Sequence, residues 1–448
     1  MREFDAVVIG AGPGGYEAAL QLALGGIKTL LIDRSKEHIG GVCLNEGCIP
    51  AKAYLQSADY LSKASYFKEC GIEMEIKGAD IRKMKEKTRL LKNELRSGVV
   101  WQLEQAGVEM MYGSASFVDS YTIEVSGERI GFQKCIIATG GKVRETALLP
   151  LDGKRILSSG DIFEQESLPS SIAIVGGGAI GCEFATFFRA LGVEVTLIVR
   201  GSQLLSGEDE DIAKALLRAF KKSGIRVLTS TAVQKAEVCD NGVELSLKSA
   251  DQERIRYEWV LVAIGRDPNT EGLNLENAGI KQNEKGFIEV NGAFQTIQKH
   301  IFSVGDCINT PAYAHTAYAE ARIAACNIIS GGMDGNAHIS PSAVFSNPPI
   351  ASCGLREREA KEQGREIEVK KAFFKVNSKA KILGDDSGFV KIIVDSKDSV
   401  IVGASIIGVE STEIIHELVL AVEKKHTYHQ MKEMIHIHPS VSEILKYI

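Results

Sequence analysis

The chain has 448 residues, which suits roughly three domains of about 150 residues each and excludes a single small binding module. Charged residues make up 25% and hydrophobic residues 44% of it, and no stretch reaches 18 apolar residues, so disordered, collagen-like and membrane classes are excluded. The net charge of −6 offers no positive field to a nucleic acid. Nine scattered cysteines and no visible secretory signal favour a cytoplasmic location.

A glycine-rich turn follows the first predicted strand, residues 4–9, and opens an Ala/Leu-rich helix over 16–24. Its glycines are Gly10, Gly12 and Gly15. This G-x-G-x-x-G spacing permits a tight turn and places a pyrophosphate at the helix N-terminus. Asp33 ends the next predicted strand, where a carboxylate can bond a ribose hydroxyl. The segment therefore predicts a dinucleotide site.

Two cysteines, Cys43 and Cys48, follow in a glycine-containing stretch that could curl enough for them to bridge. Pro50 suits a first helical turn, so Cys48 is expected near a helix N-terminus, which favours a thiolate. Lys52 lies one helical turn later and adds positive charge. The spacing favours redox chemistry over two buried cysteines or half of a zinc site.

A second copy of the strand, glycine turn and helix covers 172–191. Its glycines are Gly176, Gly178 and Gly181. The position equivalent to Asp33 is Val199, followed by Arg200, so the acidic residue is missing there. Two copies predict two dinucleotide sites.

Two regions outside these copies lack the strand, glycine turn and helix pattern. Residues 148–170 contain two prolines and two glycines and predict a linker. From about 341 the chain predicts strands and a helix over 412–425 without a glycine fingerprint, which indicates an α+β domain with an assembly role.

A histidine motif lies near the C-terminus. Pro439 favours an extended backbone at His438, so that ring is expected to project from a loop. Glu443 could complete a capping box with Ser440, or could hydrogen-bond His438 and fix the tautomer of a base. Both interpretations can hold together.

The segments GGVCLNEGCIPAK, IFSVGDC and HPSVSE, with the two glycine turns, closely resemble the flavin-dependent pyridine nucleotide-disulfide oxidoreductases, and within them the dihydrolipoamide dehydrogenases. The resemblance covers nearly the whole chain. It implies an α/β fold with two Rossmann-like dinucleotide-binding domains and a C-terminal α+β dimerisation domain. The expected boundaries are 1–147 for the first part of the FAD-binding domain, 148–268 for the NAD(P)-binding domain, 269–338 for the rest of the FAD-binding domain and 339–448 for the dimerisation domain.

The resemblance also implies which residues bind each cofactor. For FAD they would be Gly10, Gly12, Gly15, Asp33, Lys52, Thr139, Gly140, Asp306, Ala314 and His315. For NAD or NADP they would be Gly176, Gly178, Gly181, Val199, Arg200, Gly265 and Arg266. No metal site is expected.

The catalytic residues follow from the same resemblance. Cys48 would be the flavin-proximal thiol and Cys43 the interchange thiol of a redox disulfide. Lys52 would lie near the flavin and pair with Glu183. His438 would be the base and Glu443 its orienting carboxylate, reaching the cysteines of the partner subunit in a homodimer.

The implied activity is oxidation of dihydrolipoyl groups on a lipoyl-bearing acyltransferase or carrier of a 2-oxo acid dehydrogenase or glycine cleavage complex, with NAD as the final acceptor. Arg200 supports one alternative, an NADPH-dependent reductase of another disulfide or of a metal ion, because arginine suits a 2′-phosphate. A second alternative is a flavoprotein that serves only as an assembly subunit. The residues favour the dihydrolipoyl enzyme and NAD.

Overall fold

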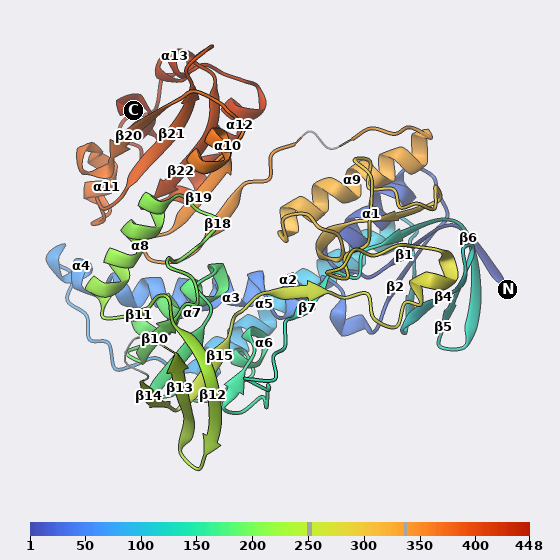
Figure 1. Ribbon diagram of the computed structural model, residues 1–448, viewed down its shortest axis with the longest axis horizontal. Coiled ribbons are helices and arrows are strands. Elements are labelled where there is room, and N and C mark those ends of the chain that lie inside the picture. Colours follow the sequence, from blue (N-terminus) through green and yellow to red (C-terminus); the bar gives the residue numbers. More distant parts are fainter. Residues whose placement is uncertain (249–252, 336–337) are drawn as a thin grey trace. The chain divides into compact units, whose positions relative to one another are not determined.

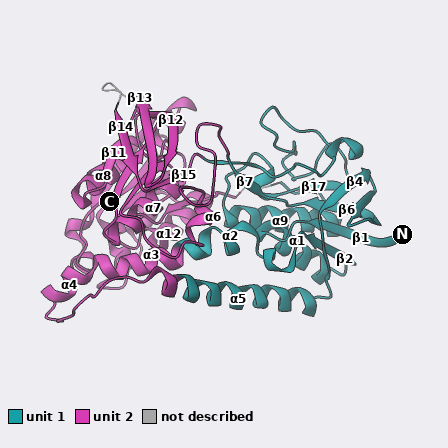
Figure 2. Cartoon of the chain, turned by 90° about the horizontal axis from the view of Figure 1, so that it is seen from below, with its two compact units in different colours: residues 1–51, 85–144, 265–337 teal, residues 52–84, 145–264, 338–448 magenta. Residues whose placement is uncertain are grey.

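The computed structural model describes residues 1–248, 253–335 and 338–448, which divide into two units (Figure 2). Unit 1 comprises 1–51, 85–144 and 265–337. Unit 2 comprises 52–84, 145–264 and 338–448. Helices α3 and α5 each run from one unit into the other along the chain.

Unit 1 is built on a seven-stranded sheet in the order β3-β2-β1-β6-β5-β4, with β17 also paired to β6 (Figure 1). Its strands are β1 (Arg2–Ile9), β2 (Thr29–Asp33), β3 (Glu109–Tyr112), β4 (Ala115–Asp119), β5 (Thr122–Val125), β6 (Glu128–Ile137) and β17 (Ile301–Ser303). Strands β3, β2, β1, β6 and β17 run parallel. The apolar run of β1 is buried on both faces, as expected of a parallel strand covered by helices.

The helices of unit 1 follow the first glycine turn and include Cys43. They are α1 (Pro13–Leu24), α2 (Gly41–Asn45), most of α5 (Ile81–Gln105) and α9 (Ala314–Ser330), and a small ribbon pairs β7 (Gly141–Val143) with β16 (Arg266–Pro268). Helix α1 begins at Pro13, three residues before its predicted start, because proline fits the first turn, where its missing N–H leaves no bond unmade.

Unit 2 contains the second copy of the repeat as an all-parallel sheet in the order β11-β10-β9-β15-β8. Its elements are β8 (Ile156–Leu157), α6 (Ser159–Ile162), β9 (Ser171–Val175), α7 (Ala179–Ala190), β10 (Glu194–Ile198), α8 (Glu210–Ser223), β11 (Arg226–Leu228) and β15 (Trp259–Val262). The linker predicted over 148–170 is therefore wrong in part. Its Ile156 and Leu157 are apolar and buried as a strand, and Ser158 caps α6.

An antiparallel sheet and its helices form the C-terminal part of unit 2. The sheet has the order β18-β19-β22-β21-β20, and a separate ribbon has the order β12-β13-β14. The elements are β12 (Ala232–Cys239), β13 (Gly242–Lys248), β14 (Arg254–Tyr257), β18 (Ser342–Val344), β19 (Ile350–Gly354), α10 (Glu357–Glu362), β20 (Ile367–Phe373), α11 (Ser378–Ile382), β21 (Phe389–Asp395), β22 (Ile401–Ile407), α12 (Ser411–Glu423) and α13 (Tyr428–Lys432). Unit 2 also holds most of α3 (Cys48–Ser62) and all of α4 (Ala64–Glu69).

The predicted fold class, two Rossmann-like halves and a C-terminal α+β region, is confirmed. Within the described ranges, no helix is both long and apolar enough to cross a membrane.

Candidate active site

The two glycine turns have the same backbone geometry. Gly10 and Gly176 have φ angles of +101° and +124°, which favour glycine. A Cβ at Gly10 would lie 2.4 Å from a backbone oxygen after β6, and one at Gly176 would lie 2.1 Å from a backbone oxygen after β15. A Cβ at Gly15 or Gly181 would approach the oxygen of the first glycine of its own turn to 1.7 or 2.0 Å. The glycines therefore permit close strand-to-helix packing in both copies.

The start of each helix fits a pyrophosphate. Gly12 caps α1 and Gly178 caps α7, and neither helix has a side-chain cap or an acidic residue in its first turn. A Cβ at Gly178 would meet nothing within 4 Å, and one at Gly12 would meet only the Cα of Gly41, at 3.8 Å. Both turns thus present backbone amides and open space, as an anionic dinucleotide requires.

In each copy, a residue at the end of the second strand contacts the middle residue of the glycine turn. An Asp33 carboxylate oxygen accepts a hydrogen bond of 2.7 Å from the amide of Ala11, the middle residue of the first turn. In the second copy, a Cβ at the equivalent Gly177 would lie 2.8 Å from the methyl groups of Val199. Val199 is buried and Arg200 is exposed. The second copy thus replaces a polar contact with an apolar one.

Asp306 lies in a short 3-10 turn directly after β17. Burial raises the pKa of its carboxyl, although the Arg266 guanidinium, 3.9 Å away, opposes the rise. Arg266, expected at the nicotinamide, therefore lies in unit 1 with Asp306. No sequence motif marks Glu320, a buried residue whose carboxylate accepts a 2.7 Å hydrogen bond from the amide of Gly305 and fixes this turn.

Four further residues expected at FAD also lie in unit 1, whereas Lys52, expected there too, lies in unit 2. Thr139 and Gly140 follow β6, and the buried Thr139 hydroxyl has no hydrogen-bond partner among the described residues. Ala314 begins α9, and the ring of His315 stacks on that of Tyr313 at 5.2 Å. The Thr139 hydroxyl fits a bound polar group such as FAD.

The two cysteines lie in two consecutive helices, α2 and α3. Cys43 is half-buried in α2, and Cys48 is the exposed first residue of α3, as its spacing to the proline predicted. Helix α2 begins against the first glycine turn, where a Cβ at Gly41 would lie 2.5 Å from the Cα of Gly12. Gly47 approaches the carbonyl of Val42 closely and so lets the chain fold back between the cysteines.

Lys52 and Glu183 form a closely held ion pair in unit 2. The lysine ammonium donates to both carboxylate oxygens at 2.8 and 2.9 Å, and Glu183 is buried. No sequence motif marks Phe345, whose amide donates to the same carboxylate at 3.1 Å and whose ring lies 4.6 Å from the lysine ammonium. These contacts fix the position of one positive charge.

His438 and Glu443 form the second pair of unit 2. The His438 Nδ1 lies 3.0 Å from the Glu443 carboxylate, and the histidine side chain is 70% exposed. The Lys446 ammonium, helped by the Ser440 amide and by His438, holds the pKa of Glu443 down to about 2. The capping box is only half made, because the Ser440 amide donates to Glu443 but its hydroxyl is buried without a partner among the described residues.

Two other polar groups in the described part of the chain resemble sites. Asp209, Asp211 and Glu357 lie close enough to hold a cation, but the fully buried Lys391 ammonium contacts all three at 2.5–3.1 Å. The Lys391 ammonium therefore already occupies the place that a cation would take, and Lys371 pairs with Asp211 as well.

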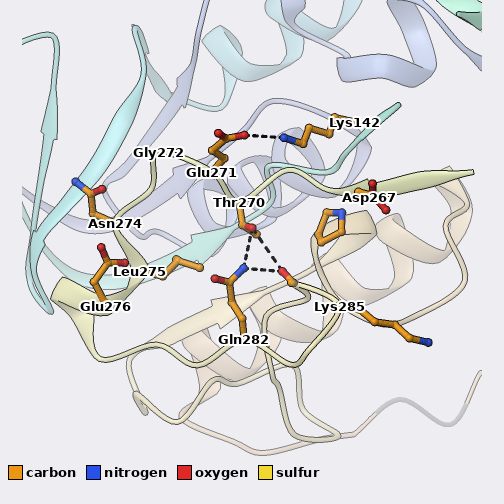
Figure 3. A pocket seen from close by; sticks show the side chains of 12 residues that line it. Lys142, Asp267, Thr270, Glu271, Gly272, Asn274, Leu275, Glu276, Gln282 and Lys285 are labelled. Carbon is orange, nitrogen blue, oxygen red and sulfur yellow. Dashed lines mark hydrogen bonds and ion pairs between the residues drawn. The ribbon is translucent and has the colours of Figure 1, made fainter. Parts of the chain in front are cut away.

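A surface cavity of about 350 Å³ lies in unit 1 (Figure 3). Its polar groups bond one another, with Lys142 on Glu271 at 2.6 Å and Gln282 on Thr270 at 2.8 Å. None of the predicted site residues lines it, so we assign it no role.

Comparison with known families agrees with this geometry. The family described as pyridine nucleotide-disulphide oxidoreductase matches residues 4–321, and the dimerisation domain of the same family matches residues 340–447. The prediction of an FAD- and NAD-dependent oxidoreductase is thereby confirmed.

Similar proteins cover the whole chain. A dihydrolipoyl dehydrogenase from Geobacillus stearothermophilus is 36% identical over 99% of this chain and 94% of its own length, and one from Staphylococcus aureus is 34% identical over 99% and 95%. Among solved structures, the HOCl-induced flavoprotein disulfide reductase RclA from Escherichia coli matches with a TM-score of 0.89 and 27% identity, over 99% of both chains. The chain belongs to the pyridine nucleotide-disulphide oxidoreductase family, whose members use FAD and NAD.

Proposed function

We propose that this oxidoreductase oxidises protein-bound dihydrolipoyl groups and passes the electrons to NAD. The similarity to two dihydrolipoyl dehydrogenases over nearly their full length supports this substrate. The observation that carries the chemistry is the His438–Glu443 pair, because an exposed imidazole held by a buried carboxylate suits a general base for a dithiol.

Each residue then has a defined role. His438 accepts a proton from one substrate thiol, and the resulting thiolate attacks the Cys43 sulfur of a Cys43–Cys48 disulfide, so that Cys48 leaves as a thiolate. The second substrate thiol attacks the mixed disulfide and its proton passes to the leaving Cys43 sulfur, so that the oxidised lipoyl ring is released, Cys43 becomes a thiol and Cys48 stays a thiolate. FAD, held at the first glycine turn, would supply hydride transfer to NAD, with the reduced Cys43–Cys48 pair as the source of the two electrons. The ammonium of Lys52, held by Glu183, supplies a fixed positive charge for that transfer.

We also propose a homodimer in which His438 of one subunit serves the cysteines of the other. The region matched by the dimerisation domain exposes apolar side chains that a second copy could cover. Ile435 and Ile437 are 99% and 83% exposed, and Leu420 is 53% exposed. The external partner would be a lipoyl-bearing acyltransferase or carrier of a 2-oxo acid dehydrogenase or glycine cleavage complex.

Single cysteine variants test the redox pair. Cys48→Ser should bind FAD but show no long-wavelength thiolate-to-flavin absorption after two-electron reduction, whereas Cys43→Ser should show this absorption without reduction. Steady-state rates with lipoamide, in both directions, test the substrate. A full absorption band in reduced Cys48→Ser would overturn the order of the two thiols.

Mixed dimers test the subunit arrangement. Neither His438→Gln nor Cys43→Ser alone should turn over lipoamide efficiently, but a verified heterodimer of the two should recover activity, because one of its sites joins intact cysteines to an intact base. Heterodimers without recovery would place the base in the same subunit as the cysteines it serves.

A second candidate is reduction of another disulfide or of a metal ion at the expense of a nicotinamide cofactor. It is favoured by the similarity to RclA, of which a Cu(II) complex is among the matched structures, and by Arg200. Rates with Cu(II) and NADH or NADPH, compared with rates on lipoamide, separate the two candidates. Faster Cu(II) reduction than lipoamide turnover would favour the second.

The nicotinamide preference depends on Val199 and Arg200. We propose that NAD is preferred but poorly discriminated, because position 199 offers neither a bond to the ribose nor a charge that repels a 2′-phosphate. Val199→Glu should shift kcat/KM further toward NAD. A wild-type preference for NADP above about a hundredfold would show that Arg200 dominates.

A further inference from the structure

A loop of unit 2, residues 200–209, joins β10 to α8 beside the second glycine turn. The Leu205 amide donates to the carbonyl of Gly177, the middle residue of that turn, at 2.8 Å. Leu204 is buried, and a Cβ at Gly177 would lie 3.3 Å from its side chain. Because the second strand of a dinucleotide-binding fold leads to the adenosine ribose, the loop is expected at the adenosine end of a bound cofactor.

The residue that contacts the turn has a strained backbone. Leu205 has a φ of +47°, a conformation that persists in residues other than glycine only when the surroundings fix it. The next two residues, Ser206 and Gly207, are exposed. The Glu208 amide donates to the Leu205 carbonyl at 2.7 Å and ties the strained residue to the end of the loop. Whatever holds Glu208 therefore also helps to hold Leu205.

Glu208 is held by side chains of the C-terminal region. The Arg356 guanidinium donates to both carboxylate oxygens, each at 3.0 Å. The hydroxyls of Ser342 and Ser352, in β18 and β19, donate to the same carboxylate at 3.1 and 2.7 Å. The Arg356 and Glu208 side chains are only 14% and 9% exposed. A forked pair of this kind fixes orientation as well as distance.

The adjacent Asp209 is held in the same way. The buried Lys391 ammonium lies 2.8 Å from its carboxylate, and the Glu357 amide donates to that carboxylate at 3.0 Å. Asp209 precedes α8 but makes no side-chain bond that caps it. Residues of the region that matches the dimerisation domain therefore hold the end of the loop.

The Glu208–Arg356 pair matters more for geometry than for net stability, because the desolvation of two buried charges offsets most of their attraction. We propose that Glu208 and Arg356 are positioning residues for the nicotinamide cofactor. Through Leu205 they hold the loop 200–209 against the second glycine turn, so that the surface for the adenosine end is formed before the cofactor binds. The inference rests on the proposed nicotinamide site at this turn and not on the lipoyl substrate.

Steady-state kinetics of the holoenzyme, with NADH as donor and ferricyanide as acceptor, test this anchor without a lipoyl substrate. The double variant Glu208→Gln, Arg356→Met removes both charges together, so that neither is left buried and unpaired. The KM for NADH and the inhibition constant of ADP-ribose, which lacks the nicotinamide, should both rise about fivefold to tenfold, whereas kcat should change less than about twofold. Arg356→Lys keeps the charge but loses the fork, so both values should rise only about twofold to threefold, and this variant also serves if the double variant does not fold.

Hydrogen exchange tests the anchor without turnover. In the double variant, a peptide that covers the loop should exchange about tenfold faster than in wild type, because the Leu205 amide is held less firmly to the turn. Arg365→Met is the matched control, since Arg365 pairs with Asp395 of β21 at 2.9 Å, and it should change neither the exchange nor the kinetic values.

Unchanged ADP-ribose binding in the double variant, even with faster exchange, would overturn the inference. Val199→Glu separates this failure from a failure of the proposed nicotinamide site. If Val199→Glu alters nucleotide affinity and the double variant does not, the site stands and the inference fails. If neither variant alters it, the proposed site fails and the inference fails with it.

Discussion

Two histidines of the last segment, His436 and His438, make the same kind of bond in opposite surroundings. His438 is 70% exposed and holds Glu443 through Nδ1, whereas His436 is 5% exposed and holds Glu417 through Nε2 at 3.1 Å. An ionised carboxylate only accepts, so each bonded nitrogen carries the proton and the other carries the lone pair. That lone pair faces solvent in His438 but is buried without a partner among the described residues in His436. Exposure of the second nitrogen, rather than the carboxylate contact, thus separates a candidate base from a packing residue.

The largest effect is expected from a variant that breaks the His438–Glu443 pair. His438→Gln should lower lipoamide turnover by about two to four orders of magnitude, the usual scale for the loss of a general base. The flavin absorption spectrum and the thermal unfolding midpoint should remain close to wild type, because the side chain is mostly exposed. His436→Gln is the matched control, and an equal loss of turnover in that variant would erase the distinction between the two histidines.

A smaller loss is expected from the carboxylate that orients the base. Glu443→Gln keeps the shape of the side chain but removes its charge, so turnover should fall about tenfold to a hundredfold. The loss should appear in kcat more than in KM, because Glu443 contacts the base and not the substrate. A loss of turnover that follows a fall in the thermal unfolding midpoint would indicate a structural role for Glu443.

The sequence predicts one of these histidine pairs and not the other, for a physical reason. His438, Ser440 and Glu443 are close along the chain, so local spacing reports their contact. His436 and Glu417 are 19 residues apart and meet only because α12 packs against the final segment. Phe345 is a stronger case, since its amide meets a carboxylate 162 residues away.

The fold shows the same contrast between features set by residues close along the chain and features that arise only from contacts between distant residues. Glycine spacing predicts both turns, because a tight turn limits which residue can follow a strand. The strand β8 was missed because two apolar residues between prolines and glycines carry no periodicity.

Loss of the buried His436–Glu417 pair should lower the stability of the fold rather than the rate of turnover. His436→Ala removes a side chain that fills a buried position and leaves Glu417 without its donor, so the thermal unfolding midpoint should fall by about 2–4 °C for a chain of this size. Turnover at 25 °C should change less than about threefold. Glu417→Gln, which keeps a polar partner, should produce a smaller fall, and an unchanged midpoint in His436→Ala would contradict a packing role.

The smallest expected effect comes from Lys446, whose ammonium contacts the Glu443 carboxylate of the His438–Glu443 pair. Lys446 is the main cause of the low pKa of Glu443, about 2 against an ordinary 4.5. A lowered carboxyl pKa stabilises the fold above the ordinary value, and this contribution is lost as the pH falls from 4.5 toward 2. Lys446→Met should therefore lower the unfolding midpoint by about 1–2 °C at neutral pH, and the difference from wild type should close within that acidic window. Lys424→Met, which removes an exposed lysine with no ion pair among the described residues, should show no such pH dependence. A Lys446→Met difference that stays constant from pH 7 to pH 3 would show that the lysine acts through its packing and not through its charge on Glu443.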